Sequence, residues 1–297
     1  MKFGIMPLFL REFLTQAQWV KSFVRMVEAA GCDSVWQVEH PIVAEDYEPL
    51  YSYSADGKAP FSPAVIMPDP LEWLAFAAAA SDTIKLGTAV VVLPLHSPIV
   101  IAKRVATLDA LSGGRVLLGV GSGWQKEEYA AVHVPYEQRG KRLDEIIEAM
   151  RVLWRDSPAS YAGEHYQFHR VHCDTKPARP EGVPILIGGS TEVAAKRAGR
   201  LGNGFYPYVI SPEDLAKRLQ TLRRTAREHG RNPDDIEITA WPSSWRQGGA
   251  MDLGLVREYA ALGVQRLIFS AHEAGSLEMA GIERFIQRYR DEIIAKL

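Results

Sequence analysis

The chain contains little cysteine, carries almost no net charge and has no long apolar run. Its two cysteines, Cys32 and Cys173, form no Cys-x-x-Cys pair and are too few for a disulfide framework, so a reducing cytoplasm is expected. No stretch approaches the roughly 18 consecutive apolar residues of a membrane span. A net charge of −2 gives no general attraction to nucleic acid or to anionic lipid. We therefore expect a cytoplasmic protein without a nucleic-acid or membrane partner.

Two nucleotide-binding motifs are also missing. Gly119, Gly121 and Gly123 alternate at the end of a predicted strand, but Trp124 stands where G-x-G-x-x-G needs its third glycine. No Walker loop is present. The alternating glycines instead leave a strand end without side chains, which lets a flat or charged ligand approach the backbone.

Apolar residues make up 47% of the 297-residue chain, enough for a substantial core, and they follow an alternating pattern of strands and helices. Strands are predicted at residues 2–6, 33–37, 84–93, 116–119, 184–187, 204–208, 236–240 and 266–269. The plainest helix follows the fourth strand, with a 3.6-residue stripe of Leu143, Ile146, Ile147, Met150, Leu153 and Trp154. The predicted helix caps are Thr15 with Gln18, Ser190 or Thr191, Ser211 and Asp252.

Strands that alternate with helices indicate an α/β fold, the (β/α)8 TIM barrel, formed as a single domain by residues 1–297. The segments 41–69 and 157–183 are expected to be loop insertions at its C-terminal face, the second with a small hairpin over 161–168. A doubly wound sheet is the alternative, because the strand at 204–208 is weak.

In such a barrel the active site lies at the carboxyl ends of the strands. This rule selects Glu39 and His40, the region 89–94, Gly121 to Trp124, and Gly188 to Thr191. An imidazole at His40 is a candidate to pass a proton or to hydrogen-bond a substrate near neutral pH. A histidine that only hydrogen-bonds loop backbone is the alternative.

The segment Gly188 to Thr191 places free backbone N–H groups and two hydroxyls at a helix start, a pattern that suits a phosphate. An ordinary capped turn would explain the same residues. The cations Lys126, Arg139, Lys141 and Arg142 are equally ambiguous. They are either solvated or close enough to the barrel mouth to meet an acidic ligand.

Two clusters of polar residues are interpreted as surface features. One irregular segment carries His165, His169, His172, Cys173 and Asp174. Their spacing matches no structural zinc pattern, and we interpret the segment as a polar hairpin without a metal. Glu127 and Glu128 are interpreted as the solvated start of a helix rather than as a catalytic carboxylate pair.

Six blocks, in order, resemble the luciferase-like monooxygenase superfamily and, within it, the F420-dependent oxidoreductases. They are Asp33 to His40, Leu86 to Pro98, Leu111 to Trp124, Arg139 to Glu145, Gly163 to Phe168 and Pro184 to Thr191. The resemblance spans nearly the whole chain. It implies a (β/α)8 barrel that binds FMN or the deazaflavin F420 at its carboxyl-end mouth, often as a homodimer. It also implies a non-proline cis peptide at about Ala89-Val90, which bulges the third strand against the flavin ring.

The resemblance also suggests roles for residues of this chain. His40 matches the active-site histidine of the family. The candidate cofactor contacts are Ala89, Val90, Gly121, Ser122, Gly123 and Trp124 at the ring, and Gly188, Gly189, Ser190 and Thr191 at the phosphate. This chain departs from the family's sugar-phosphate dehydrogenases in two places. Those enzymes carry a glutamate at the position that Trp124 occupies here, and a tryptophan shortly after the histidine, where this chain has Pro41 to Ala44. Sugar-phosphate oxidation is therefore not expected. Ser122 stands where the bacterial luciferases carry an arginine beside the glycine strand, and this difference weakens the assignment of FMN-phosphate binding to that position.

These observations predict an F420-dependent oxidoreductase that moves a hydride between C5 of the deazaflavin and a small organic substrate. His40 would donate or accept the proton, Trp124 and the 41–69 loop would wall the pocket, and Lys126 or nearby arginines would meet the acidic tail of F420. The alternatives are an FMN-dependent monooxygenase, a catalytically silent flavin-binding barrel and, remotely, a metal-dependent hydrolase. A homodimer is expected from the family resemblance, and the small, apolar surfaces of the helices near 71–80 and 98–111 support this expectation.

Overall fold

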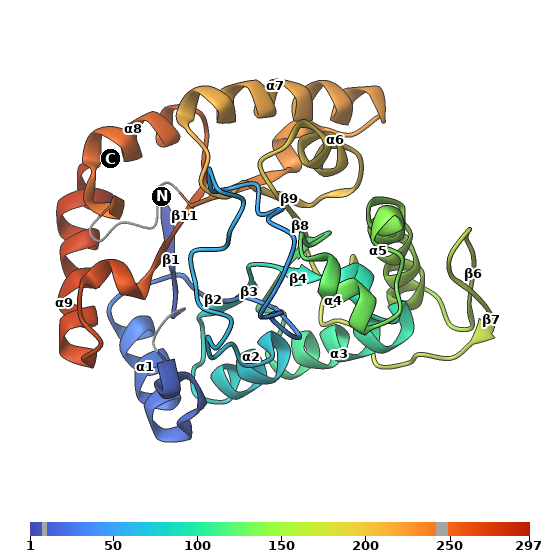
Figure 1. The fold of residues 1–297 in the computed structure, drawn as a ribbon, viewed down its shortest axis with the longest axis horizontal. Coiled ribbons are helices and arrows are strands. Elements are labelled where there is room, and N and C mark those ends of the chain that lie inside the picture. Colours follow the sequence, from blue (N-terminus) through green and yellow to red (C-terminus); the bar gives the residue numbers. More distant parts are fainter. Residues whose placement is uncertain (8–10, 242–248) are drawn as a thin grey trace.

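The computed structural model describes residues 1–7, 11–241 and 249–297, and it shows a closed parallel barrel surrounded by helices (Figure 1). The barrel strands are β1 (Lys2–Met6), β2 (Ser34–Gln37), β3 (Lys85–Thr88), β4 (Val91–Val92), β5 (Val116–Gly121), β8 (Ile185–Gly188), β9 (Gly204–Tyr206), β10 (Glu237–Ala240) and β11 (Arg266–Ser270). They pair in the order β3-β2-β1-β11-β10-β9-β8-β5, and β5 closes the ring by pairing with both β3 and β4. This closure confirms the predicted (β/α)8 barrel and excludes the doubly wound sheet.

Helices cover the outside of the ring, and their order follows the strands along the chain (Figure 1). They are α1 (Ala17–Ala29), α2 (Pro70–Ala78), α3 (Pro98–Leu111), α4 (Lys126–Ala131), α5 (Arg139–Arg155), α6 (Glu192–Leu201), α7 (Pro212–Glu228), α8 (Leu253–Ala261) and α9 (Met279–Arg288). Short 3-10 turns lie at Arg11–Thr15, Leu93–Leu95, Tyr136–Gln138, Pro233–Asp235, Gly249–Met251, Ala271–Ala274 and Ile294–Lys296, and a π-helical turn lies at Tyr289–Ile293.

Most of the predicted helix caps are present. The side chains that cap α6, α7 and α8 are Thr191, Ser211 and Asp252, as predicted. The capping box predicted from Thr15 and Gln18 is wrong. Helix α1 begins at Ala17 without a side-chain cap, and the Thr15 hydroxyl donates to the carbonyl oxygen of Glu12 at 3.0 Å. The preceding 3-10 turn therefore uses the side chain that the helix was expected to use.

The third barrel strand is broken in the middle. The sequence predicts one buried strand over 84–93, but β3 ends at Thr88 and β4 begins at Val91. A cis peptide bond joins Ala89 to Val90 at the break. The prediction of a continuous strand is wrong, whereas the position of the cis peptide expected from the family resemblance is confirmed.

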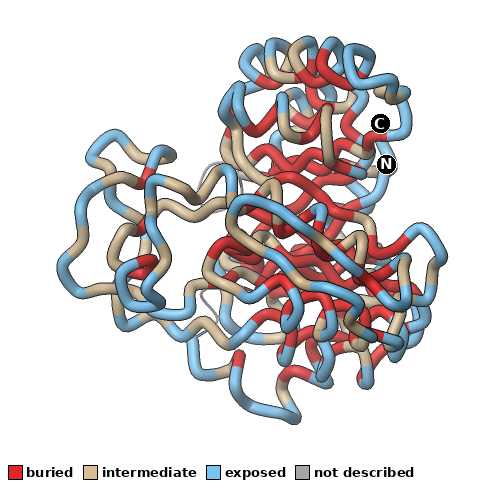
Figure 2. The backbone as a smooth tube through the Cα atoms, turned by 90° about the vertical axis from the view of Figure 1, so that its right-hand side faces the viewer, coloured by how far each residue is buried: buried red, intermediate tan, exposed pale blue. Residues whose placement is uncertain are grey.

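Buried side chains form two layers. The larger layer lies between strands and helices, and Figure 2 shows buried positions concentrated on both. A smaller cluster fills the barrel interior and consists of Met6, Trp36, Leu117, Leu186, Tyr206, Trp241 and Ile268. At the amino end of the barrel, the buried guanidinium of Arg266 pairs with Asp33, 2.7 Å away, and with Glu237. These ion pairs lie at the opposite end of the barrel from the carboxyl ends of the strands, where the active site of such a barrel is found.

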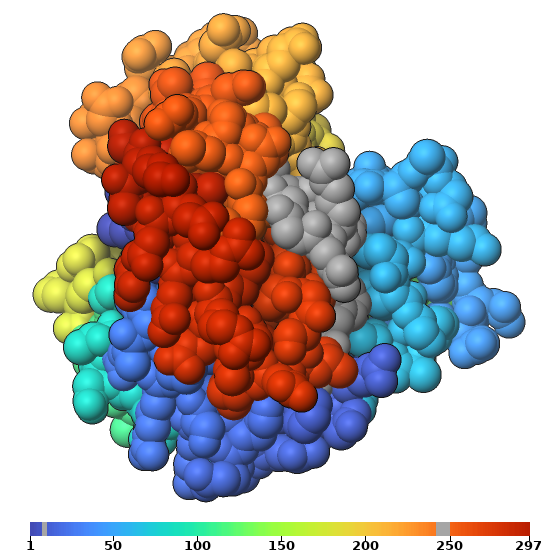
Figure 3. All heavy atoms as spheres, turned by 90° about the vertical axis from the view of Figure 1, so that its left-hand side faces the viewer, coloured from blue at the N-terminus to red at the C-terminus, as the bar shows by residue number. Residues whose placement is uncertain are grey.

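Two segments leave the barrel pattern. Residues 41–69 form no helix or strand and cross the face of the barrel, where they project beyond the helices (light blue in Figure 3). Residues 157–183 contain the antiparallel hairpin of β6 (Ala159–Ala162) and β7 (Gln167–Val171), which the sequence predicts at 161–168. This hairpin lies outside α5, away from the barrel centre (Figure 1). Within the described residues, every helix is too short or too polar to cross a bilayer.

Candidate active site

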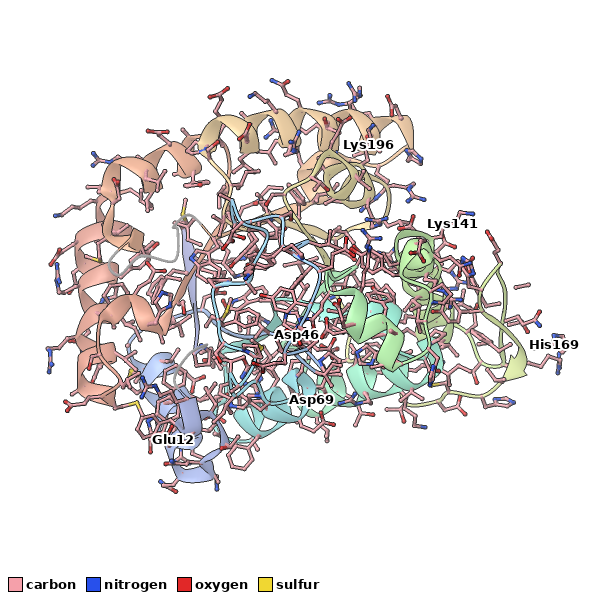
Figure 4. All side chains as sticks on the ribbon, in the orientation of Figure 1. Glu12, Asp46, Asp69, Lys141, His169 and Lys196 are labelled. Carbon is pink, nitrogen blue, oxygen red and sulfur yellow. The ribbon has the colours of Figure 1, made fainter. Side chains whose placement is uncertain are left out.

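One cavity of about 740 Å³ opens at the carboxyl ends of the strands, beneath the 41–69 segment. The predicted site residues that line it are His40, Ala89, Val90, Gly123, Trp124 and Gly189. The predicted residues that lie outside its lining are Gly121, Ser122, Gly188, Ser190 and Thr191. The structure therefore brings together residues from four consecutive barrel strands and separates the remainder. Asp46, in the crossing segment, lies over the middle of the barrel in Figure 4.

His40 reaches the cavity from the loop after β2 and is held by a carboxylate. Its Nδ1 lies 2.9 Å from Oε1 of Glu128, whose side chain is fully buried. Burial raises the pKa of the Glu128 carboxyl, and the hydrogen bond with His40 opposes that rise only in part. With Nδ1 engaged, Nε2 is the ring nitrogen available to a ligand in the cavity. The interpretation of His40 as a residue that only binds loop backbone is wrong.

The interpretation of Glu128 as a solvated helix residue is also wrong. Helix α4 turns this side chain inward beneath the 41–69 segment, and its neighbours bind the same segment. The side-chain oxygen of Gln125 accepts the N–H of Ala44 at 3.3 Å, and that of Glu127 accepts the N–H of Glu48 at 3.0 Å. The first turn of α4 therefore orders both His40 and the segment that covers the cavity.

A second buried carboxylate holds the third strand. One oxygen of Glu39 accepts the N–H of Val92 at 2.7 Å, and the other lies 2.9 Å from Nε2 of His96. The Glu39 side chain is only 6% exposed, so both of its oxygens are satisfied within the protein. Glu39 thus connects the end of β2 to β4, on the far side of the Ala89-Val90 peptide.

Glycines of β5 and β8 leave space for the third barrel strand, between β3 and β4. A Cβ at Gly119 would overlap the carbonyl oxygen of Thr88. A Cβ at Gly121 would lie 2.7 Å from Cγ2 of Val90, and one at Gly188 would lie 2.7 Å from Cγ1 of the same residue. The Val90 side chain therefore occupies the space beside Gly121, and a contact between Gly121 and the cofactor stays a prediction.

Aromatic side chains form the outer wall of the cavity, as predicted for Trp124 and the 41–69 segment. The Trp124 ring centroid lies 5.8 Å from that of His40 and 5.3 Å from that of Tyr51. Phe61 approaches the other side of His40, at 5.7 Å between centroids. Tyr53 packs edge-on against Tyr208 at 4.6 Å. A flat, apolar ligand would meet aromatic faces and edges on several sides.

A polar groove of about 910 Å³ adjoins the cavity and shares Tyr53 with it. Ser190, Thr191 and Arg218 line this groove. The Ser190 hydroxyl donates to the carbonyl oxygen of Tyr208 at 2.6 Å, and Nε of Arg218 donates to the carbonyl oxygen of Ser190 at 2.9 Å. The Ser190–Thr191 turn therefore combines a capped helix start with one cation, an arrangement that suits an anion.

The cations predicted to be near the mouth have partners already. Nζ of Lys126 lies 2.5 Å from Glu48, and that of Lys141 lies 3.3 Å from Glu164. The guanidinium of Arg139 stacks on the ring of Tyr136 at 3.8 Å, and that of Arg142 donates to the Tyr166 hydroxyl at 3.3 Å. These contacts favour the interpretation of the four cations as surface residues.

The histidine-rich segment lies on the outer hairpin, with His169 at the edge of the molecule (Figure 4). Within the described residues, Glu145, Glu164 and His165 come close enough to share a metal ion. The Glu145 carboxylate, however, accepts the backbone N–H groups of residues 164–166 at 2.9 to 3.2 Å. Its oxygens thus order the hairpin turn.

Sequence reasoning missed two side chains of the site. Glu128 is 88 positions from His40, and nothing in a pair of adjacent glutamates indicates which one is buried. Tyr206, on the strand that looked weakest, lines the cavity, and its buried hydroxyl has no hydrogen-bond partner among the described residues. Tyr206 and Tyr208 alternate at the end of a strand, so both side chains point to the same face, and this pattern could have identified the two tyrosines.

Comparison with known proteins agrees with this geometry. The sequence profile of the luciferase-like monooxygenase family matches residues 1–243. The chain belongs to this family. It is therefore an oxidoreductase by class, as expected from the sequence. An uncharacterised member from Mycobacterium tuberculosis is 30% identical over 276 residues, which are 92% of this chain and 92% of that protein.

Two characterised proteins are also similar. The F420-dependent glucose-6-phosphate dehydrogenase of Kineococcus radiotolerans is 32% identical over 223 residues, covering 73% of this chain and 60% of that protein. The structure of the coenzyme F420-dependent tetrahydromethanopterin reductase of Methanopyrus kandleri matches with a TM-score of 0.76 and 16% identity, over 99% of each chain. The second likeness supports the fold of the family alone.

Proposed function

We propose that this member of the luciferase-like family is an F420-dependent oxidoreductase that transfers a hydride between the deazaflavin C5 and a small organic substrate. One observation carries the proposal. The imidazole of His40 and the cis peptide Ala89-Val90 line the same aromatic cavity at the barrel mouth. The similarity to an F420-dependent dehydrogenase over most of the chain supports F420 over other cofactors.

The residues present fit a tricyclic redox ring. The lining of the cavity is largely apolar and aromatic, as the faces of such a ring require. Ala89, Val90 and Trp124 would hold the ring, and the buried, unpartnered hydroxyl of Tyr206 offers a hydrogen bond to a bound molecule. Ser190, Thr191 and Arg218 would hold the phosphate in the adjoining groove. When bound, F420 supplies hydride chemistry, which protein side chains lack.

His40 is the proposed acid–base residue. In the oxidative direction its Nε2 accepts the proton of a substrate hydroxyl, and in the reductive direction it returns that proton. Glu128 holds Nδ1 and stabilises the positive charge that the ring acquires. Trp124, Phe61 and the 41–69 segment exclude water from the reacting atoms.

Titration of the cofactor-free protein with F420 and with FMN tests the assignment. Tighter binding of F420 is expected, and a clear preference for FMN would replace the proposal with a flavin-dependent monooxygenase. Once a substrate is known, His40→Ala should abolish most of the turnover while the protein keeps its affinity for F420. Unchanged turnover would remove the role of His40 and would favour the catalytically silent barrel.

We also propose the domain organisation, the compartment and the oligomeric state of the enzyme. Residues 1–297 would act as a single cytoplasmic domain, with 41–69 and 157–183 as insertions, and without nucleic acid. A second copy of this chain would cover the groove between α2 and α3, where Ile99, Val100 and Leu111 are 41%, 57% and 80% exposed. The groove also contains the ion pair of Arg104 with Glu72, so exposed apolar side chains lie beside charged ones, as at the rim of a protein interface. Sedimentation of the wild type and of Val100→Glu should show a dimer and a monomer respectively.

A further inference from the structure

The lining of the active-site cavity differs in charge from the groove beside it. None of the described residues that line the cavity is a lysine or an arginine. Its only acidic side chain, Glu39, already binds the N–H of Val92 and the ring of His96. Arg218 lies in the adjoining groove and donates to the carbonyl oxygen of Ser190. The described lining of the cavity therefore offers an anionic group no cationic side chain, whereas the groove offers Arg218.

Most hydroxyl groups of the cavity are also engaged within the protein. The Tyr51 and Tyr208 hydroxyls lie 3.0 Å apart and form a hydrogen bond, and the Tyr53 hydroxyl bonds to Ser190. Two side-chain groups of the described lining are the ligand contacts that we consider, Nε2 of His40 and the buried hydroxyl of Tyr206, which has no partner among the described residues. Tyr206 is only 2% exposed and stacks on Trp36 at 5.6 Å, so its hydroxyl is fixed in place. A ligand that satisfies both atoms needs few polar groups of its own.

We propose that the substrate is a neutral, mostly apolar molecule with an alcohol or carbonyl oxygen as its main polar group. The inference rests on the proposed function, and it names the substrate class of the same site. In the oxidative direction the C–H bond of the alcohol carbon would break, and F420, when bound, would supply the acceptor for the hydride. The O–H proton passes to Nε2 of His40, and the C=O bond forms. Tyr206 donates the second hydrogen bond to the substrate.

A sugar phosphate does not suit this lining. Its phosphate would lose hydration without gaining a cationic partner from the described lining, and its hydroxyls would face aromatic carbon. Unpaired polar groups discriminate strongly against a ligand, whereas an extra methylene changes affinity only modestly. The chain is thus expected to differ in substrate from the glucose-6-phosphate dehydrogenase that it resembles.

Equilibrium binding of two probes tests the substrate class without turnover. Cyclohexanone and glucose 6-phosphate would be titrated into the F420-loaded protein and into the cofactor-free protein, with tryptophan fluorescence as the readout. Cyclohexanone should bind the F420-loaded protein at least 10-fold more tightly than glucose 6-phosphate does, and its affinity should not change with ionic strength, because no charge is involved. In the cofactor-free protein only cyclohexanone tests the lining, because glucose 6-phosphate could also bind the groove beside Arg218. Equal or tighter binding of glucose 6-phosphate would overturn the proposal. Failure of F420 itself to bind would instead overturn the proposed function, and the cofactor-free titration would still test the lining.

The role of Tyr206 has a matched control in Tyr289. Both hydroxyls are buried and unpartnered among the described residues, but Tyr289 lies in the core between Phe3 and Phe269, away from the cavity. Tyr206→Phe should weaken cyclohexanone about 3- to 10-fold, as expected for one hydrogen bond, and should not weaken methylenecyclohexane, which lacks the oxygen. Tyr289→Phe should change neither. Equal losses for both probes, or the same loss in both variants, would show that Tyr206 makes no bond to the substrate oxygen.

Discussion

Nδ1 of His40 lies 2.9 Å from Oε1 of Glu128, although the two residues are 88 positions apart. This contact joins the end of β2 to the short helix α4, which follows β5. Because the Glu128 side chain is fully buried and that of His40 is 12% exposed, the ring has one well-defined orientation. The acid–base chemistry of the site therefore depends on a carboxylate that does not line the cavity.

Glu128→Gln should slow hydride transfer by roughly 10- to 100-fold, a part of the 10²- to 10⁴-fold that general acid–base catalysis typically contributes. The amide cannot stabilise a protonated imidazole, so the limb of the pH profile that needs the protonated ring should move to lower pH. F420 affinity should change less than 3-fold, since Glu128 does not line the cavity.

Glu127→Gln is the matched control, because this residue holds only the N–H of Glu48. It should leave the pH profile in place. Stopped-flow rates against pH for both variants make the comparison. Equal effects of the two substitutions, or an unchanged profile in Glu128→Gln, would exclude the positioning role of Glu128.

Gly121→Ala should disturb the third strand, because its new Cβ would lie 2.7 Å from the Val90 side chain. Overpacking of this kind typically destabilises a protein by about 1–3 kcal/mol. Urea unfolding and F420 titration should both show the loss, since Val90 lines the cavity. Gly140→Ala, at the start of α5, adds a Cβ that meets only the end of Arg197, and it should be neutral or slightly stabilising. A Gly121→Ala protein with wild-type stability and affinity would mean that Val90 is free to move.

Arg218→Ala should weaken FMN or F420 binding about 10-fold, because one charge-assisted contact to phosphate is lost. It should not weaken riboflavin, which has the flavin ring without the phosphate. Arg224→Ala, on the same helix and exposed beside Glu228, controls for the loss of charge on α7. Calorimetric dissociation constants for each pair would measure the effect. Equal losses for FMN and riboflavin would place the phosphate away from Arg218.

Acid should remove one specific contribution to stability, at Glu28. Burial acts to raise the pKa of this carboxyl, but hydrogen bonds from Thr83, Ile84 and Asp82 outweigh it and hold the pKa below the ordinary value of 4.5. A lowered pKa means that the stabilisation is complete above 4.5 and is lost as the pH falls through the folded value. Glu28→Gln should therefore lower the free energy of unfolding by about 1 kcal/mol at neutral pH, and by less at acidic pH. The exposed Glu45→Gln should show no such trend, and a constant deficit for Glu28→Gln would contradict the assignment.

The sequence predicts the barrel well, because the alternation of apolar strands and amphipathic helices is a local pattern. It also places His40 and Trp124 at the mouth, since both follow strand ends. It fails where distant segments meet. The partner of His40 and the space that Gly121 leaves for Val90 depend on how the strands are arranged around the ring. The burial of Tyr206 depends in the same way on its neighbours across the barrel interior.

A crystal structure of the F420 complex tests the central claim most directly. The account predicts deazaflavin density in the cavity lined by Ala89, Val90 and Trp124, with the phosphate in the groove beside Ser190 and Arg218 and with His40 still bonded to Glu128. A ring bound elsewhere, or a cavity that remains empty while F420 binds in solution, would contradict it.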